Sequence, residues 1–219
     1  MSEKTRRGNS KSKTASPQKE ITKPHNTGRA PQVKTVPPHW KLVLDPETIS
    51  RSISRISFEI LEKNRDVKKL AIVGIRTCGE FLGKRIQKRI KEIEGIEIPF
   101  GVIDITLYRD DLSHTLSQPT LKGTEIPFHI TGSRIILVDD VFYTGRTVRA
   151  ALDAIIDFGR PDCVELASLA DRGHREFPIR PDYVGKNLPT QKSDFVRVRL
   201  SEQSFEDGVY LIQGGQTGK

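Results

Sequence analysis

The chain has 219 residues, a formal net charge of +8 at pH 7 and two cysteines. This length is enough for one domain with a sizeable core. The sequence has no run of about 18 apolar residues, so no membrane-spanning helix is expected. The two cysteines lack paired spacing, which argues against a disulfide framework or a cysteine-ligated metal and favours a reducing, cytoplasmic location.

Most of the positive charge lies in residues 1–39, which hold nine Lys and Arg residues against two Glu. This segment is rich in Ser, Thr, Pro and Lys and cannot bury enough apolar surface to offset its ordering entropy. We therefore expect a basic, disordered tail, followed by one folded domain over residues 40–219. The tail lacks the apolar stretch of a secretory signal. A nucleic-acid-binding arm, a solvated extension and a wrongly assigned start codon are all compatible with its composition.

The first element predicted in the domain is a helix that begins after Asp45, with Pro46 at its first position and isoleucines at helical spacing. A short buried strand over residues 70–75 then leads through a glycine-bounded loop into a second helix. A second strand is predicted over residues 100–107. Residues 109–128 are polar and interrupted by Pro and Gly, which is typical of a mobile loop and hairpin.

The most informative segment is the run of residues 134–147. Residues 135–138 are continuously aliphatic, as a strand buried on both faces requires. Asp139 and Asp140 stand where that strand is expected to end. From residue 148 onward, apolar residues recur at helical spacing, so the run predicts a strand, an acidic pair, a turn and a helix.

The turn over residues 144–147 is suited to an anion, because unpaired N–H groups and the positive end of the helix dipole meet there. Gly145 permits close backbone approach, and the Thr144 and Thr147 hydroxyls can donate hydrogen bonds. The acidic pair would accept from ribose hydroxyls or bind a divalent cation. This chemistry suits a sugar phosphate. The simpler alternative is an acidic strand end followed by a capped helix, and the spacing of a P-loop is not matched.

Further strands are predicted over residues 164–170, near Tyr183, and over residues 196–200 and 209–212. Strands that alternate with helices predict an α/β fold with a mostly parallel sheet and helices on both faces. In such a sheet, ligands bind beyond the carboxyl ends of the strands.

Residues 138–147 resemble the phosphoribosyl-diphosphate (PRPP) signature of type I phosphoribosyltransferases. Residues 103–113, 171–180 and 183–190 are similar to one branch, the pyr operon regulatory proteins, which are both RNA-binding attenuators and uracil phosphoribosyltransferases. The resemblance extends from about residue 42 to residue 200. It implies a mostly parallel central sheet flanked by helices, with a small hood and a flexible β-hairpin loop.

The resemblance also implies the site residues. The PRPP signature would comprise Asp139, Asp140, Val141, Phe142, Tyr143, Thr144, Gly145, Arg146 and Thr147. The diphosphate loop would comprise Arg76, Thr77 and Cys78, and the flexible loop would contribute Arg109 and Asp110. The nucleotide and its base are expected near Arg172, Val184, Gly185 and Val196.

An RNA-binding set follows from the same resemblance: Arg51, Ser54, Thr77, His174, Arg175, Arg180 and Lys186. Two positions depart from the family pattern. Cys78 stands where we expect a basic residue, and the lost charge would weaken diphosphate contacts. Phe58 stands where we expect a histidine, so a hydrogen bond is lost there while the ring could still stack on a base. A basic surface loop is the simpler alternative for residues 172–186.

Together these features predict a UMP-responsive, RNA-binding regulator of pyrimidine genes that also converts uracil and PRPP to UMP and diphosphate. Mg²⁺ is expected to be held mainly by PRPP, with no direct protein ligand assigned. The other expected partners are the pyr mRNA leader and further copies of the chain, in a homodimer or higher homo-oligomer. The alternatives are an enzyme without RNA regulation, a catalytically weak UMP or PRPP sensor, and a purine phosphoribosyltransferase. Tyr143 disfavours the last, because some purine-using relatives carry an Asp there.

Overall fold

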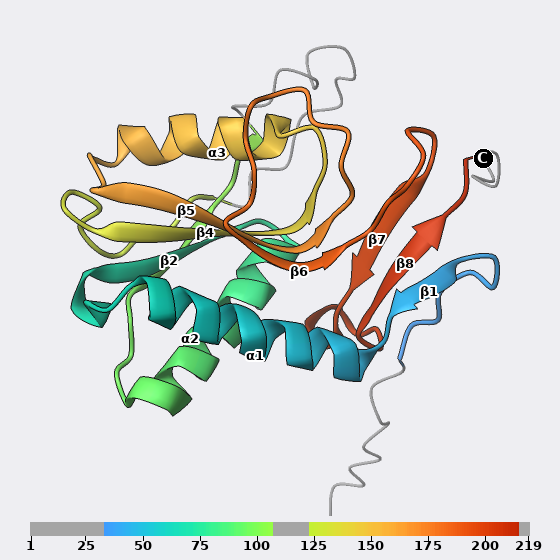
Figure 1. Ribbon diagram of the computed structural model, residues 1–219, viewed down its shortest axis with the longest axis horizontal. Helices are drawn as coiled ribbons and strands as arrows, with labels where there is room; N and C mark the ends of the chain where they lie inside the picture. Colours follow the sequence, from blue (N-terminus) through green and yellow to red (C-terminus); the bar gives the residue numbers. More distant parts are fainter. Residues whose placement is uncertain (1–32, 107–122, 215–219) are drawn as a thin grey trace, which may run out of the picture. The chain divides into compact units, whose positions relative to one another are not determined.

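The computed structural model describes residues 33–106 and 123–214, all within the structural unit Gln32–Lys219. In chain order (Figure 1) the elements are β1 (Lys41–Leu44), α1 (Pro46–Lys63), η1 (Val67–Lys69), β2 (Leu70–Ile75), α2 (Cys78–Glu94), β3 (Phe100–Ile103), β4 (Arg134–Phe142), α3 (Arg146–Asp157), β5 (Cys163–Asp171), β6 (Tyr183–Asn187), β7 (Phe195–Arg199), η3 (Ser201–Gln203) and β8 (Gly208–Ile212). The predictions for residues 1–32 and for the loop residues Arg109 and Asp110 fall outside the described residues.

Five strands form the central sheet, in the order β3-β2-β4-β5-β6. All four pairings are parallel. Strand β4 lies at the centre, where Val138 is in register with Gly74 of β2 and Ala167 of β5. Because the strands run in one direction, the carboxyl ends of β2, β4 and β5 meet at one edge of the sheet. The predicted α/β fold with a mostly parallel sheet is confirmed.

Helices cover both faces of this sheet: α1 and α2 lie below it and α3 above it in the view of Figure 1. Successive strand residues point to opposite faces. Accordingly, Ile136 and Val138 pack into the core cluster that contains α1 and α2, whereas Ile135 and Leu137 pack into the cluster that contains α3. Both faces of β4 are therefore buried, which explains why its aliphatic residues are continuous rather than alternating with polar ones.

Helix α1 begins as predicted. The Asp45 carboxylate accepts a hydrogen bond from the backbone N–H of Thr48 (2.7 Å), and Pro46 occupies the first helical position. The apolar stripe of the helix is buried, at Ile49, Ile53, Ile56 and Ile60.

A second, antiparallel sheet has the strand order β1-β8-β7. Arg85 of α2 fastens the segment before β8 to the main core, because its guanidinium binds Glu202 (2.7 Å and 2.8 Å) and Asp207. Residues 33–39 of the predicted tail belong to the described part of the chain. There the Lys34 N–H donates to the Ser204 carbonyl (2.8 Å).

Two predicted strand boundaries are wrong. Strand β3 ends at Ile103 rather than near residue 107, because the Asp104 carboxylate accepts from the Thr106 N–H (3.0 Å) and turns the chain. Strand β4 does not end before the acidic pair. It continues to Phe142, since β5 runs beside it as far as Asp171.

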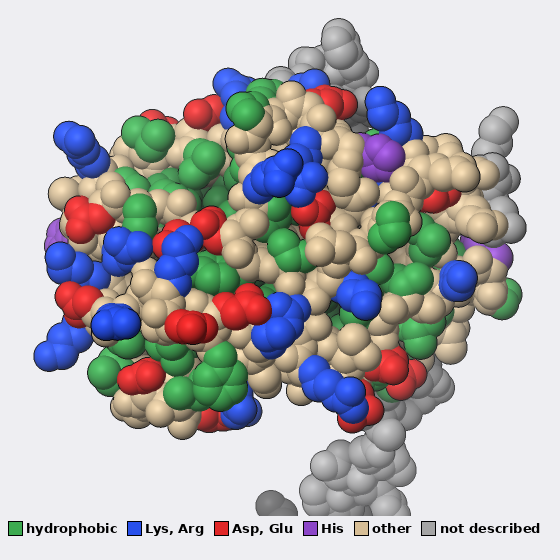
Figure 2. Space-filling view, viewed as in Figure 1, with side chains coloured by type: hydrophobic (Ala, Val, Ile, Leu, Met, Phe, Trp, Pro, Cys, Tyr) green, Lys and Arg blue, Asp and Glu red, His purple; other side chains and the backbone are tan. Residues whose placement is uncertain are grey.

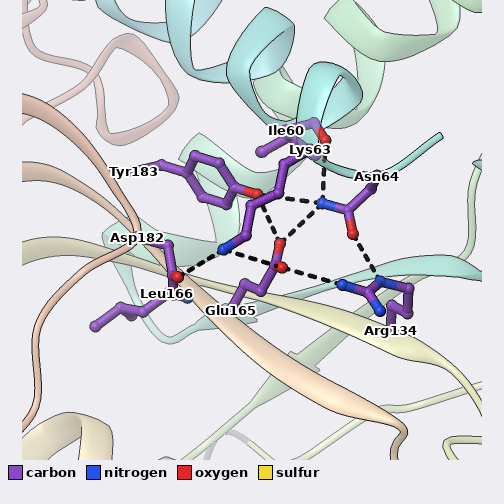
Figure 3. A network of polar contacts seen from close by, with 8 residues as sticks. All are labelled: Ile60, Lys63, Asn64, Arg134, Glu165, Leu166, Asp182 and Tyr183. Atoms are coloured by element: carbon purple, nitrogen blue, oxygen red, sulfur yellow. Dashed lines mark hydrogen bonds and ion pairs between the residues drawn. The ribbon is translucent and has the colours of Figure 1, made fainter.

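A buried polar network closes the amino end of the sheet (Figure 3). Glu165 of β5 is 5% exposed and accepts from Tyr183 Oη (2.6 Å) and Asn64 Nδ2 (2.8 Å). Lys63 and Arg134 each lie 3.2 Å from its other oxygen. Burial raises the pKa of Glu165, but the hydrogen bonds from Tyr183, Asn64 and Lys63 outweigh burial and hold the pKa below its ordinary value. The network joins α1 to the starts of β4, β5 and β6.

Basic and acidic side chains are interspersed over α1 and α2 on the face seen in Figure 2. Several form ion pairs one helical turn apart, at Arg51–Glu47, Arg55–Glu59 and Lys84–Glu80. Within residues 33–106 and 123–214, the chain has no helix with the length and apolarity needed to cross a bilayer.

Candidate functional site

Two adjoining cavities lie beyond the carboxyl end of β4. The first, of about 350 Å³, is lined by Asp139, Val141, Phe142, Tyr143, Thr144, Gly145, Arg146, Thr147 and Val148. The second, of about 400 Å³, is lined by Ile75, Arg76, Asp104, Ile105, Thr106, Asp139, Asp140, Val141 and Thr147. Asp139, Val141 and Thr147 are shared. The fold thus brings Arg76 of the expected diphosphate loop and the whole run 139–147 to one cleft.

The turn before α3 has the geometry of an anion site. Gly145 precedes the helix with φ of 93°, in the left-handed region that glycine tolerates best. A Cβ at this position would also lie 3.3 Å from the Phe177 side chain. Thr144, Arg146 and Thr147 line the first cavity, so the first N–H groups of α3 and its positive dipole end are available to an anion.

The two carboxylates of the cleft are held by the backbone of their own strand. Asp139 is 6% exposed and accepts from the Asp140 N–H (2.9 Å). Asp140 in turn accepts from the Val141 N–H (2.9 Å). Both side chains line the second cavity. Fixed carboxylates in this position repel a phosphate but accept well from sugar hydroxyls.

Arg76 provides positive charge beside the acidic pair. Its Nη1 lies 3.5 Å from Glu80 Oε2, and its Nε is buried without a hydrogen-bond partner in the part of the chain that the structure describes. The peptide bond between Arg76 and Thr77 is cis. Arg76 lines the second cavity, so its guanidinium is placed to donate to an anionic group there.

Cys78 is the first residue of α2 and is half-buried beside the acidic pair. Burial, and then the nearby Asp140 carboxylate, raise the pKa of its thiol to about 12, although Arg199 acts in the opposite direction. Its Sγ lies 3.7 Å from Gln203 Oε1. The side chain is therefore a neutral thiol at physiological pH, and it does not replace the charge expected at this position.

Arg172 is placed against the signature loop rather than on either cavity wall. Its guanidinium stacks 4.0 Å above the Tyr143 ring. Its donors reach the Gln191 carbonyl (2.9 Å) and Thr190 Oγ1 (3.2 Å), and the residue is 6% exposed. Arg172 therefore packs against the Tyr143 ring and fixes it, while residues 143–147 line the first cavity.

The expected RNA-binding residues of the 171–190 segment differ in accessibility. His174 has φ of 62°, and its Nε2 lies 2.7 Å from the Thr190 carbonyl. Arg175 forms an ion pair with Asp171. Arg175, Arg180 and Lys186 are exposed, and His174 is half-buried. The three arginine and lysine side chains are thus open to a partner, although Arg175, like His174, also holds the segment together.

Helix α1 presents two more of the expected RNA-binding residues, while Thr77 lies at the start of α2. Arg51 is exposed and pairs with Glu47 of its own helix, and Ser54 is half-buried. Phe58 is 51% exposed, with the Arg89 guanidinium 5.7 Å from its ring centre. An aromatic ring and several cations are therefore available on this surface.

One functional candidate was absent from the sequence prediction. Arg55 of α1 donates to the carbonyls of Val184 (2.8 Å) and Gly185 (2.7 Å) of β6. Those two residues were expected near the nucleotide base. A contact between residues 129 positions apart leaves no trace in helical periodicity, so the sequence alone gave no signal for it.

A parallel α/β sheet with an acidic pair and an anion-binding turn at the end of its central strand defines a phosphoribosyltransferase. Residues 39–203 match the family model described as a phosphoribosyl transferase domain, and the chain belongs to that family.

The chain is 55% identical over 174 residues to the Bifunctional protein PyrR of Listeria monocytogenes serotype 4b (strain CLIP80459), which covers 78% of this chain and 95% of the relative. It is 54% identical over 170 residues to the protein of the same name from Deinococcus radiodurans, with 78% and 93% covered. Among solved structures, the hypoxanthine phosphoribosyltransferase of Trypanosoma cruzi matches with a TM-score of 0.60 and 16% identity, over 80% of this chain and 97% of that one. This last likeness establishes the fold alone.

Proposed function

We propose that the chain is a cytoplasmic, UMP-responsive, RNA-binding regulator of pyrimidine genes that also makes UMP from uracil and PRPP. The observation that carries the proposal is the 55% identity to proteins named Bifunctional protein PyrR over 95% of their length. The cleft supports it, because an acidic pair, an anion-binding turn and Arg76 lie side by side there.

Each part of the cleft suits one part of PRPP. The turn at 144–147 binds the 5′-phosphate through N–H groups and hydroxyls. Asp139 and Asp140 accept from the ribose hydroxyls, and Arg76 donates to the diphosphate. In the reaction, the bond from C1′ to the diphosphate oxygen breaks, a bond from C1′ to uracil N1 forms, and the N1 proton is released.

Charge stabilisation and positioning account for the catalysis in this proposal. Positive charge develops on C1′ as the diphosphate leaves, and the buried carboxylate of Asp139 with its neighbour Asp140 favours that charge. Mg²⁺ bound with PRPP would neutralise the diphosphate. Among the described residues, no three His, Cys, Asp or Glu side chains gather into a metal site.

Exposed basic residues on α1 and in residues 171–190 support an RNA-binding role. Arg51, Arg180 and Lys186 are all exposed, and cations of this kind contact RNA phosphates in a salt-dependent way. We propose that the leader of pyr mRNA is the ligand and that the chain acts as a homodimer or higher homo-oligomer. If UMP tightens RNA binding, RNA tightens UMP binding by the same factor.

The test measures both activities in one preparation. UMP formation is followed from uracil and PRPP with Mg²⁺, and the affinity for the leader RNA is measured with and without UMP. A shuffled RNA of equal length and composition is the control. We expect turnover together with UMP-dependent, leader-selective binding. Turnover without selective RNA binding would show that the chain is an enzyme without RNA regulation. Selective RNA binding without turnover would show that it is a nucleotide sensor without catalytic activity.

A further inference from the structure

Arg55 connects two elements that are far apart in the sequence. Its Nη2 donates to the Val184 carbonyl at 2.8 Å and to the Gly185 carbonyl at 2.7 Å. Its Nη1 donates to Glu59 Oε1 at 2.7 Å. The planar guanidinium is therefore fixed on one side by its own helix and on the other side by strand β6.

Strand β6 is an edge of the central sheet and pairs with β5. Unpaired carbonyls of an edge strand ordinarily bond to water. Here two consecutive carbonyls share one cationic donor, and hydrogen bonds to a charged donor are the stronger kind. On the inner side, a Cβ at Gly185 would lie 2.4 Å from the Leu169 carbonyl. The backbone at 184–185 is thus packed against β5 on one side and held by Arg55 on the other.

Arg51, one helical turn earlier on α1, provides a comparison. It has the same side chain and also pairs with a glutamate of its own helix, Glu47. Its contacts lie within α1, whereas those of Arg55 cross to β6. Of these two arginines, Arg55 is the one whose hydrogen bonds join β6 to the helix that presents Arg51 and Ser54.

We propose that Arg55 is a positioning residue that couples the base-binding strand to the RNA-facing side of α1. The inference rests on the proposed function. When the uracil ring of UMP bonds to the backbone at 184–185, the two carbonyls are fixed, the guanidinium fork is fixed with them, and α1 is held in the arrangement that binds RNA. Without the nucleotide, β6 is less well fixed, and helix α1, which Arg55 joins to β6, is less well fixed in the arrangement that binds RNA.

The test uses Arg55→Lys, with Arg149→Lys as the matched control. Arg149 is exposed on α3 and, like Arg55, pairs with a carboxylate one turn along its own helix, that of Asp153, but it lies outside the expected RNA-binding set. Lysine keeps the charge and the helix propensity, but its ammonium cannot hold both carbonyls and Glu59 in a planar fork. The Kd for leader RNA is measured with and without saturating UMP. We expect UMP to tighten RNA binding by roughly 5-fold or more in the unaltered protein and in R149K, and by less than about 2-fold in R55K.

A second readout separates positioning from electrostatic contact with RNA. In R55K, we expect the KM for uracil to rise while kcat changes little, because the base-binding backbone is less well fixed. An R55K protein with the unaltered tightening factor and uracil KM would overturn the coupling role and leave the proposed function intact. An unaltered protein whose RNA affinity ignores UMP would overturn the proposed function and the inference with it.

Discussion

The two ends of the central sheet use carboxylates in opposite ways. At the amino end, Glu165 is enclosed by donors from Tyr183, Asn64, Lys63 and Arg134 (Figure 3). At the carboxyl end, the acidic pair is held by backbone N–H groups and lines open cavities. A buried carboxylate therefore does not by itself mark a functional site. The space beside it, and the donors left for a ligand, distinguish the two ends.

The largest expected effect comes from Asp140→Asn at the carboxyl end. The substitution removes a negative charge beside the developing positive charge on C1′, so kcat/KM for UMP formation should fall by about 100-fold. The measurement is steady-state turnover, with urea unfolding of the same variant as the control. A free energy of unfolding within about 0.5 kcal/mol of the unaltered protein is expected. Unchanged turnover would show that this carboxylate is not part of the site.

The corresponding change at the amino end is Glu165→Ala. It leaves the buried partners of the network without their acceptor, so the free energy of unfolding should fall by about 3 kcal/mol. Urea unfolding measures the loss. The folded variant should retain turnover within about twofold, since the network lies at the end of the sheet away from the cleft. A Glu165→Ala variant that keeps its stability but loses activity would contradict the assignment of a structural role to the amino end of the sheet and a functional role to the carboxyl end.

A smaller effect is expected in the pH dependence of stability. The folded pKa of Glu165 lies below its ordinary value of 4.5, because its hydrogen bonds outweigh the effect of burial. The stability that it contributes is therefore present above about pH 4.5 and is lost as the pH falls through the lower, folded pKa. Comparing unfolding of Glu165→Gln and the unaltered protein from pH 7 to pH 3 should show a shallower decline in the variant. Parallel curves would contradict this account of the network.

The smallest effect concerns the two thiols, one at each end. Burial raises the pKa of both, to about 12 for Cys78 beside the acidic pair. Cys163, at the start of β5, is less enclosed and has Arg134 nearby to lower its pKa. We expect iodoacetamide at pH 8 to modify Cys163 at least about 10-fold faster than Cys78. Peptide mass spectrometry measures the two rates, and faster labelling of Cys78 would show a more open carboxyl end.

The sequence predicted the features that local patterns determine. The aliphatic run of β4 required burial on both faces, and the glycine of the 144–147 turn marked the start of α3. Asp45 and Pro46 marked the start of α1 in the same way. These signals depend on residues close together in the chain, so they could be read without the fold.

The features that the sequence did not predict depend on long-range pairing. Strand β4 runs past the acidic pair because β5 continues beside it. The Glu165 network draws its members from α1, β4, β5 and β6. The stacking of Arg172 on Tyr143 and the bonds of Arg55 to β6 also join distant segments. The roles assigned to Arg76, Asp139 and Asp140 depend on contacts with a ligand and remain predictions.

In the proposed function, one cleft serves both the reaction and the response of RNA binding to UMP. The most direct measurement is a titration of leader RNA affinity with UMP at several fixed concentrations of PRPP. If both ligands occupy the cleft at 139–147, the UMP concentration that gives half-maximal tightening should rise in proportion to the PRPP present. A midpoint that stays constant as PRPP increases would place the regulatory UMP in a separate site and contradict the account.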